Sequence, residues 1–389
     1  MAHPSMPDSR TMDCIERLIA FDTVSRNSNL ELIDWARRHL EARGAKIRMD
    51  WSSDRQKANM LASFGEGAGG IVFSGHTDVV PVDGQVWTSD PFRASVRDGK
   101  LFGRGACDMK GFVGVVLGHA HEFAKASVRE PIHVALTYDE ELGCLGIPHL
   151  VAAMQRWGVK PRGCLVGEPT SMRPVVAHKG GYVYRCKITG KAAHSSLAPS
   201  AVNAVHYAAR LIAFIQSIAD REESQGLRAE GFDVPHTTIS VNLFKGGTAG
   251  NIVPDGAEFS FEFRYVPGFD PDALVAEITG FAARELLPRM RAIDARSDIA
   301  FERVNAIPAL DTKETDPIFR RVLDVAPDKR IGKVSYGTEA SFFQEGGVPA
   351  MVCGPGSIAQ AHKPDEFVAL EQLALCDRFV AGVLGTDAM

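Results

Sequence analysis

Histidine and carboxylate side chains stand directly after short apolar runs at several points of the chain, where they could bind a metal ion. Residues 71–73 form such a run, and Gly75, His76 and Asp78 follow it. Alternate residues of an extended chain lie on one side, so His76 could bind an ion through one ring nitrogen while Asp78 accepts a hydrogen bond from the other. Taken alone, this spacing is common at strand ends, so the prediction depends on further donors.

More acidic positions repeat this design. Asp108 lies in the glycine-rich stretch GRGACDMKG before a predicted helix, and glycines let the backbone fold closely around an ion. Glu140 and Glu141 follow the apolar run 132–137, and adjacent residues of an extended chain point to opposite sides. Glu168 follows residues 164–166 and precedes a proline, which ends a strand. Each acid by itself is typical of a solvated turn, but their coincidence favours a site.

The second histidine of the predicted site, His362, lies in the loop GPGSIAQAHKPDEF. By itself it would be interpreted as a surface loop residue. Two imidazoles and several carboxylates without a thiolate suit Zn²⁺ in a hydrolytic site, and Co²⁺ or Mn²⁺ could substitute. We expect His76 and Glu168 to bind one ion. Glu141 and His362 would bind a second, and Asp108 would bridge the two.

This donor set predicts hydrolysis by a metal-bound water. Coordination lowers the pKa of water from 15.7 to roughly 7. Glu140, which is left without a metal, would take the proton from this water and pass it to the departing amine; such help commonly contributes about 10² to 10⁴ in rate. A metal-binding interaction protein without activity is the alternative, but it would have no use for a free carboxylate beside the ions.

The elements that must position these residues alternate between strands and helices. Helices are predicted at 12–21, 30–43, 111–123 and 147–157, and strands at 46–49, 59–64, 71–74, 132–137 and around Leu165. This alternation predicts an α/β fold with a mixed sheet between helices and with ligands at the carboxyl ends of strands. Further segments at 313–323, 348–352 and 370–384 return to this pattern. We expect residues 1–180 and 307–389 to form one catalytic metal-binding domain.

Residues 181–306 differ in character and are predicted to form an inserted domain. Strands at 182–188, 237–244, 258–265 and 300–304 and helices at 201–218 and 271–285 follow the order β-α-β-β-α-β. This order is typical of a ferredoxin-like α+β fold. An unpaired sheet edge and an apolar helix would be costly to expose, so we expect a dimerisation domain and a homodimer.

Three polar residues of the inserted segment could bind a substrate. His194 lies among small residues before a helix, Asn251 lies in the glycine-rich stretch GGTAGN, and Arg264 lies on a strand otherwise built for burial. Imidazole, amide and guanidinium groups could bind an oxyanion and a carboxylate. The structural alternatives are a helix N-cap, a turn asparagine and an interface ion pair.

Composition and charge limit the kinds of partner. The 389 residues carry a net charge of −5, which does not predict nucleic-acid binding. We find no apolar run near the roughly 20 residues that cross a bilayer, and residues 1–11 lack the apolar stretch of a secretory signal. Seven scattered cysteines suit reduced thiols, and the glycines of 65–70 precede a strand, the wrong order for a dinucleotide fingerprint. We expect a cytoplasmic protein with a small-molecule substrate, and neither nucleic acid nor membrane as a partner.

The motifs HTDVVPVDG, GRGACDMKG, DEELG, GEPT and AHKPDEF resemble those of a zinc metallopeptidase family. This family contains acetylornithine deacetylase, succinyl-diaminopimelate desuccinylase, aminoacylase and bacterial glutamate carboxypeptidase. The resemblance covers nearly all of the chain after residue 12. The stretches AAHSSLAP, GGTAGNIVP and YGTEASFF most resemble the acetylornithine deacetylase branch. That branch implies hydrolysis of N2-acetyl-L-ornithine to L-ornithine and acetate in arginine biosynthesis; the alternative is another N-acyl amino acid, succinyl-diaminopimelate or a dipeptide.

The resemblance also implies roles for individual residues. It gives the five predicted ligands the same roles, with Asp78 as the orienting acid and Glu140 as the base. His194 would reach the site of the other subunit in a dimer, and Asn251 and Arg264 would bind the substrate carboxylate. Glu339, in YGTEA, would meet the cationic amine of the substrate. A cis peptide bond is expected between Asp108 and Met109.

Overall fold

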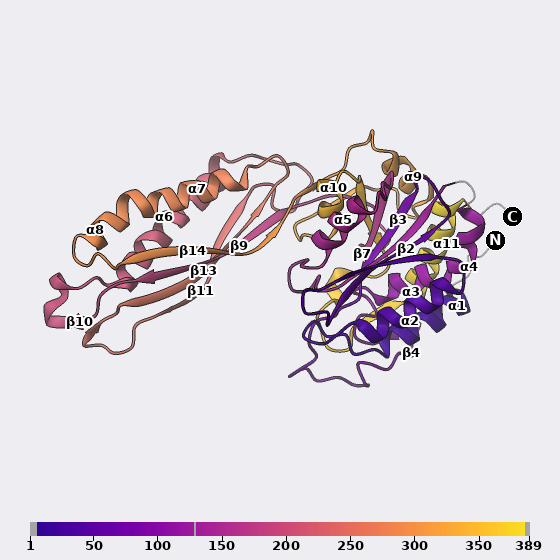
Figure 1. The fold of residues 1–389 in the computed structure, drawn as a ribbon, viewed down its shortest axis with the longest axis horizontal. Helices are drawn as coiled ribbons and strands as arrows, with labels where there is room; N and C mark the ends of the chain where they lie inside the picture. The colour runs from indigo at the N-terminus through magenta and orange to yellow at the C-terminus, as the bar shows by residue number, and fades with distance from the viewer. Residues whose placement is uncertain (1–5, 128–129, 386–389) are drawn as a thin grey trace. The chain divides into compact units, whose positions relative to one another are not determined.

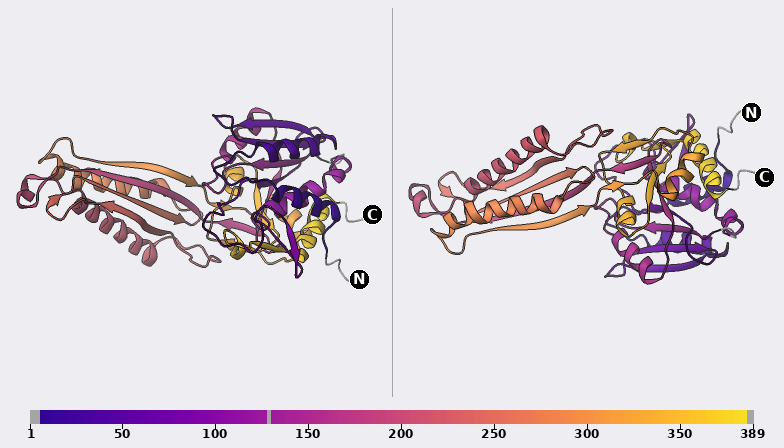
Figure 2. Two further views of the ribbon diagram at one scale, coloured as in Figure 1. Left: turned by 90° about the horizontal axis from the view of Figure 1, so that it is seen from below. Right: turned by 90° about the horizontal axis from the view of Figure 1, so that it is seen from above.

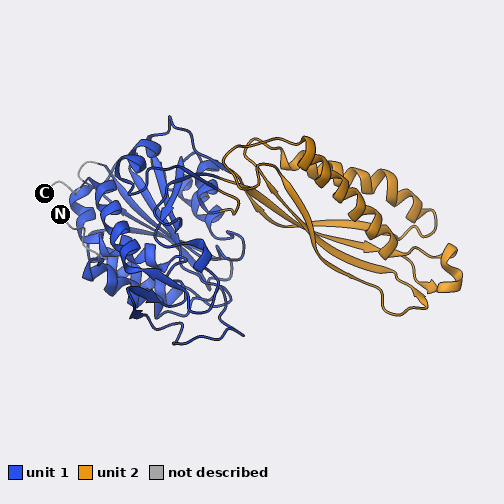
Figure 3. Cartoon of the chain, turned by 180° about the vertical axis from the view of Figure 1, so that it is seen from behind, with its two compact units in different colours: residues 1–177, 310–333, 338–389 blue, residues 178–309, 334–337 orange. Residues whose placement is uncertain are grey.

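The computed structural model describes residues 6–127 and 130–385, which form two compact units. The first unit, blue in Figure 3, comprises residues 1–177, 310–333 and 338–389, and the second, orange, comprises residues 178–309 and 334–337. The expected inserted segment was 181–306. Residues 334–337 also belong to the second unit, and the carbonyl group of Val334 accepts a hydrogen bond from the backbone N–H of Lys179 at 3.2 Å.

A mixed sheet runs through the first unit in the order β1-β2-β6-β3-β7-β17-β8-β15, with β16 beside β8. Strands β6, β3, β7 and β17 are parallel to one another, and β1 and β2 are antiparallel. The central strands are buried along their whole length, as expected for parallel strands covered on both faces. The strands are β1 (Lys46–Trp51), β2 (Ala58–Phe64), β3 (Ile71–His76), β6 (Ile132–Thr137), β7 (Gly163–Pro169), β8 (Val175–His178), β15 (Leu310–Asp311), β16 (Gly332–Val334) and β17 (Ala350–Gly354).

Helices cover both faces of this sheet, which confirms the predicted α/β class (Figure 1). One face carries α1 (Ser9–Ile19), α2 (Leu30–Glu41), α3 (Lys110–Gly118), α9 (Pro317–Val325) and α11 (Leu370–Leu384), and the other carries α5 (Ile147–Arg156) and α10 (Ala340–Glu345). The helices of the described residues 6–127 and 130–385 are not long and apolar enough to cross a membrane.

The helix predicted at 111–123 is divided into α3 and α4 (Ala120–Ala126). His119 lies between them with a ψ angle of −1°. Its ring nitrogens lie 3.2 Å from Oδ1 of Asp377, on α11, and 3.1 Å from Oε2 of Glu122. Asp377 also accepts hydrogen bonds from the hydroxyl group of Thr11 (2.6 Å) and the backbone N–H of Asp8 (2.8 Å). This polar cluster joins α1, α4 and α11 and contains none of the predicted metal ligands.

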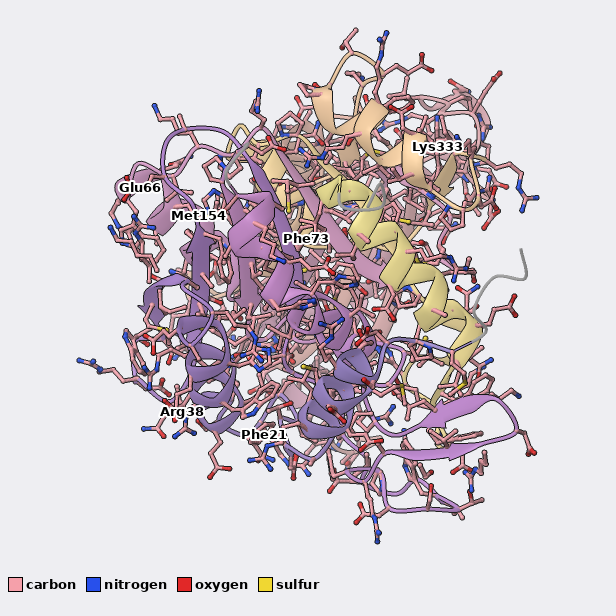
Figure 4. The ribbon with its side chains drawn as sticks, turned by 90° about the vertical axis from the view of Figure 1, so that its right-hand side faces the viewer. Phe21, Arg38, Glu66, Phe73, Met154 and Lys333 are labelled. Atoms are coloured by element: carbon pink, nitrogen blue, oxygen red, sulfur yellow. The ribbon has the colours of Figure 1, made fainter. Side chains whose placement is uncertain are left out.

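Phenylalanine rings fill the core beneath these helices. Phe73 of β3 stacks on Phe123 with 6.1 Å between centroids, and Phe64 meets the same ring edge-on at 5.3 Å. Figure 4 shows Phe73 among the interior side chains, with Arg38 and Glu66 at the periphery. Residues that point away from Phe73 along β3, including His76, therefore face the side of the sheet that carries α5 and α10.

A small sheet that the sequence did not predict lies beside the main one. It comprises β4 (Ser95–Arg97), β5 (Lys100–Phe102) and β18 (Phe367–Ala369), in the order β18-β5-β4. Phe367 pairs with Phe102 in antiparallel register. This pairing brings the loop after β5, which carries Asp108, next to the loop before β18, which carries His362.

The second unit has a four-stranded antiparallel sheet in the order β11-β13-β9-β14, which confirms the ferredoxin-like topology. Its helices pack against one face, as both views of Figure 2 show. On β13 alternate residues from Phe259 to Tyr265 are buried beneath them. The elements are β9 (Gly180–Thr189), β10 (Ala193–His194), α6 (Ala204–Gln225), β11 (Thr238–Gly246), β12 (Ile252–Val253), β13 (Gly256–Tyr265), α7 (Pro271–Phe281), a π-helical turn (Ala282–Leu286), α8 (Leu287–Arg291) and β14 (Asp298–Ile307).

Candidate metal centre

The carboxyl ends of two neighbouring parallel strands carry the buried part of the candidate site. His76 ends β3 and Glu168 lies near the end of β7, and the two strands pair with Ser74 opposite Val166. Nε2 of His76 lies 3.7 Å from Oε1 of Glu168 and 3.0 Å from Oδ1 of Asp108. All three residues are buried, and their donor atoms lie within 4.8 Å of one another. We call them the first donor group.

Asp108 also belongs to a second donor group, with Glu141 and His362. Nε2 of His362 lies 3.0 Å from Oε2 of Glu141 and 3.5 Å from Oδ2 of Asp108, and the donor atoms again lie within 4.8 Å of one another. The His362 side chain is 52% exposed. The five predicted ligands therefore come together, with different oxygens of Asp108 facing the two histidines. The peptide bond between Asp108 and Met109 is cis, as the resemblance implied.

Asp78 contacts His76 mainly through its main chain. Nδ1 of His76 lies 2.9 Å from the carbonyl oxygen of Asp78 and 3.6 Å from its Oδ1. The Asp78 carboxylate instead accepts hydrogen bonds from the backbone N–H groups of Glu140 (3.1 Å) and Glu141 (3.2 Å) and from the hydroxyl group of Ser25 (2.7 Å). Asp78 thus fixes the turn that carries both glutamates. Sequence reasoning missed this role and missed Ser25, because nothing in the sequence connects such distant positions.

Glu140 belongs to neither donor group but lies beside them. Burial raises the pKa of Glu140 well above its usual value; His76 opposes this increase, and the carboxylates of Glu141 and Asp108 add to it. The thiol group of Cys144 lies 3.4 Å from Oε1 of Glu140. A carboxyl group with a raised pKa can hold and release a proton nearer neutral pH, as general acid–base catalysis requires.

The two donor groups hold more negative charge than their imidazoles neutralise. Burial opposes a charged ring at His76, but the carboxylates of Asp108 and Glu168 outweigh it and raise the pKa of His76 well above its usual value. Hydrogen bonds to Asp108 and Glu141 raise the pKa of His362 to about 10. Burial raises the pKa of Glu168 well above its usual value, and its buried Oε1 has no hydrogen-bond partner among the described residues.

The pKa shifts of the two histidines share one electrostatic cause, because the neighbouring carboxylates favour positively charged rings at His76 and His362. Divalent cations would relieve the repulsion among these carboxylates and would give the unpartnered oxygen of Glu168 a partner. Two imidazoles and three carboxylates, with donor atoms this close together, fit a pair of Zn²⁺ ions or similar divalent metals.

Glu339 lies in the interior next to this site. The residue is 0% exposed and directly precedes α10. Burial raises the pKa of Glu339 to about 7, although His76 and the Thr137 hydroxyl group oppose this increase. Neither carboxyl oxygen has a hydrogen-bond partner within the usual distance among the described residues. The predicted contact with a substrate amine remains a prediction, and in this structure the side chain is covered.

The second unit brings together two of its three predicted site residues. His194 and Asn251 are exposed and adjacent, because β10 pairs with β12 and the backbone N–H of Ser195 donates to the carbonyl oxygen of Asn251 at 2.9 Å. Arg264 lies near the opposite end of β13, paired with Gly181. At about 3.3 Å per residue, the strand between the two ends separates Arg264 from this pair by roughly 25 Å. Nη2 of Arg264 donates to Glu262 at 3.1 Å.

Comparison with known proteins shows the family to which the chain belongs. The model of peptidase family M20/M25/M40 matches residues 72–386. This chain is a member of that family. Among curated relatives of the M20 chain, acetylornithine deacetylase of Myxococcus xanthus is 35% identical over 377 residues, which cover 94% of each chain.

Solved structures of other proteins share the fold of the M20 chain. Aminopeptidase PepT from Bacillus cereus ATCC 10987 gives a TM-score of 0.74 at 19% identity, over 99% of this chain and 100% of that one. The YXEP protein of Bacillus subtilis, described as a dinuclear metal binding peptidase from the M20 family, gives 0.67 at 17% identity over 97% of each chain. These similarities confirm the predicted fold.

Proposed function

We propose that this M20 chain is a metal-dependent amide hydrolase that converts N2-acetyl-L-ornithine into L-ornithine and acetate, a step of arginine biosynthesis. The observation that carries the proposal is the convergence of five metal-ligand side chains around the shared Asp108, with Glu140 beside them. The 35% identity to an acetylornithine deacetylase, over nearly the whole of both chains, supports this substrate.

Two Zn²⁺ ions are the proposed cofactors. His76 and Glu168 would hold one ion, Glu141 and His362 would hold the other, and Asp108 would contact both. When bound, such ions lower the pKa of water and polarise the carbonyl group of an amide.

The protein's own residues supply the proton transfers and the orientation. The Glu140 carboxylate takes a proton from the attacking water and delivers it to the nitrogen of the departing amine, which leaves as the cleaved C–N bond breaks. Its raised pKa favours uptake of the proton from water. The Asp78 carbonyl accepts the Nδ1 proton of His76 at 2.9 Å, so Nε2 of the ring is directed to the first donor group.

A homodimer is the proposed assembly, in which His194 of one chain reaches the site of the other, and Asn251 and Arg264 bind the substrate carboxylate. The roughly 25 Å between Arg264 and the other two along one sheet supports a site that draws on two chains, because one copy of the second unit does not bring these residues together. Their exposure also leaves His194 and Asn251 free for such a contact.

A cytoplasmic location is part of the proposal. The seven cysteines are all free and buried, which suits a compartment that keeps thiols reduced.

A substrate panel tests the proposed reaction. The metal-loaded protein should release acetate from N2-acetyl-L-ornithine faster than it cleaves N-acetyl-L-methionine, N-succinyl-diaminopimelate or a dipeptide, as judged by kcat/KM. Rapid turnover of another panel member, with acetyl-ornithine untouched, would contradict the substrate while leaving an amide hydrolase in place.

Mixing two inactive variants tests the shared site. The variants Glu140→Gln and His194→Ala should each have little activity alone. After subunit exchange in a 1:1 mixture, half of the dimers combine the two variants and hold one intact site, so about a quarter of the parent activity should return. A mixture that stays inactive although mixed dimers have formed would show that His194 serves its own chain.

A further inference from the structure

The carboxyl group of Glu366 connects two loops that carry metal ligands. Glu366 directly precedes β18, whose pairing with β5 places it against the loop 103–108. The backbone N–H of Gly103 donates to the carbonyl oxygen of Glu366 at 3.0 Å. The side chain therefore enters the loop of Asp108 from only four residues after His362.

Both carboxyl oxygens of Glu366 are fully occupied within this loop. Oε1 accepts hydrogen bonds from the backbone N–H groups of Cys107 (2.8 Å) and Asp108 (3.0 Å). Oε2 accepts from the backbone N–H of Gly105 (3.1 Å) and from Nη1 of Arg104 (2.7 Å). Charged acceptors form shorter and stronger hydrogen bonds than neutral ones. One buried carboxylate thus fixes the main chain on which the shared ligand Asp108 is carried.

The guanidinium group of Arg104 extends this network back to His362. It is 1% exposed, and its Nη2 donates to Oε1 of Gln85 at 2.6 Å. Nε2 of Gln85 donates in turn to the carbonyl oxygen of His362 at 3.0 Å. Nη1 of Arg104 also lies 3.3 Å from the carbonyl oxygen of Lys363. The hydrogen-bond network therefore returns to its starting point, because His362 and Lys363 are followed in the chain by Glu366.

We propose that Glu366 is a positioning residue that sets the spacing between Asp108 and His362 and so determines how tightly the second donor group binds its ion. This inference rests on the proposed metal-binding function. Glu366 touches no donor atom of either group; it acts through the main chain of Asp108 and, by way of Arg104 and Gln85, through that of His362. Residues that orient metal ligands in this way commonly change metal affinity about 10- to 100-fold when replaced.

Titration of the metal-free protein with Co²⁺ tests the inference without any substrate. In the variant Glu366→Gln one acceptor oxygen becomes an N–H donor that faces backbone N–H groups, so both loops lose their fixed spacing. The second Co²⁺ should bind at least about tenfold more weakly than in the parent, and its visible absorption band should change. The first Co²⁺, held by His76 and Glu168 on strand ends, should lose less affinity.

A matched control separates positioning from loss of stability. Asp377 is another buried carboxylate of the same unit with several donors, but it lies in the His119 cluster. Asp377→Asn should lower the thermal midpoint yet leave both Co²⁺ affinities unchanged. If Glu366→Gln folds poorly, Gln85→Met keeps the Glu366 carboxylate and all four of its hydrogen bonds. It removes the link from Arg104 to His362, together with the acceptor of Trp87, and should weaken binding of the second Co²⁺ by several-fold and leave the first unchanged.

Unchanged affinity for both Co²⁺ ions in a folded Glu366→Gln variant would overturn the inference, as would an equal loss in Asp377→Asn. A parent that binds two Co²⁺ ions but does not hydrolyse acetyl-ornithine would contradict the proposed substrate and leave the role of Glu366 intact.

Discussion

The two donor groups share Asp108 but differ in how the fold supports them. His76 and Glu168 lie at the ends of neighbouring buried strands, where the register of β3 and β7 sets their spacing. Glu141 and His362 lie on loops, and the His362 side chain is half exposed. A sheet holds ligands in place before an ion arrives, whereas loops need further hydrogen bonds to do so. We therefore expect the two groups to bind ions unequally.

Replacement of Glu140 should have the largest effect, and it tests whether both groups serve one reaction. In Glu140→Gln the amide cannot accept the proton, so kcat should fall by about 10² to 10⁴ with the metal content unchanged. The exposed Glu31 offers a control, because Glu31→Gln keeps the same loss of charge away from the site. Near-parental kcat in Glu140→Gln would remove its role as the base.

Replacement of one histidine in each donor group should have the next largest effect, and it tests whether the two groups bind their ions independently. His76→Ala removes a buried ligand of the first donor group, so the protein should lose tight binding of that ion and some thermal stability. His362→Ala should retain one tightly bound ion and lose most of its affinity for the second. Metal analysis after gel filtration measures both. Equal loss in the two variants would show that the shared Asp108 makes the sites inseparable.

Partial removal of metal should show which of the two donor groups binds its ion more weakly. A limiting amount of chelator should take the ion of the more exposed second group first, because its ligands can open to solvent without disturbing the sheet. The expected intermediate holds one ion per chain, and its thermal midpoint should lie close to that of the fully loaded protein. Loss of both ions together, with no one-ion species, is the contrary result.

The smallest effect is expected at the His119 cluster. There the positive charge between two carboxylates comes from a protonated histidine and not from a metal ion. Burial would lower the pKa of His119, but Asp377 and Glu122 outweigh it and raise it from 6.5 to about 9. The charged ring is therefore fully stabilising below pH 6.5, and its contribution is lost as pH rises through about 9. The shift corresponds to about 3 kcal/mol.

The variant His119→Gln measures this contribution. It should lower the thermal midpoint by roughly 5 °C at pH 6 and by clearly less at pH 10. Comparison with the parent at each pH cancels the titration of the metal ligands, which both proteins share. The exposed His149 provides the control His149→Gln, whose midpoint should follow the parent throughout. A pH-independent difference for His119→Gln would indicate lost packing instead of lost charge.

The positions of the main strands and helices could be predicted because apolar periodicity determines them locally. The run 132–137 is β6 to the residue, and the ligands His76 and Glu168 follow from runs of the same kind. The prediction of a single helix at 111–123 was wrong. His119, where the helix breaks, contacts Asp377 and Glu122, and the periodicity of the sequence does not encode these contacts.

What sequence reasoning missed depends on contacts between distant segments. The pairing of β5 with β18 involves strands too short to show a pattern, so the position of Glu366 against Asp108 was not predicted although it lies in the motif AHKPDEF. The separation of Arg264 from Asn251 follows from strand direction, which single residues do not reveal. Burial of Glu339 likewise results from how α10 packs on the sheet.

The position of β17 has a consequence for how the protein is made. This strand lies between β7 and β8, yet it begins only at Ala350, so the ribosome must synthesise the entire second unit before the edge of β7 gains its neighbour. A nascent or prematurely terminated chain would carry four of the five ligands but expose an apolar strand edge, which can pair with other chains. Translation that stops within the second unit should therefore yield aggregates that chaperones or proteases must remove.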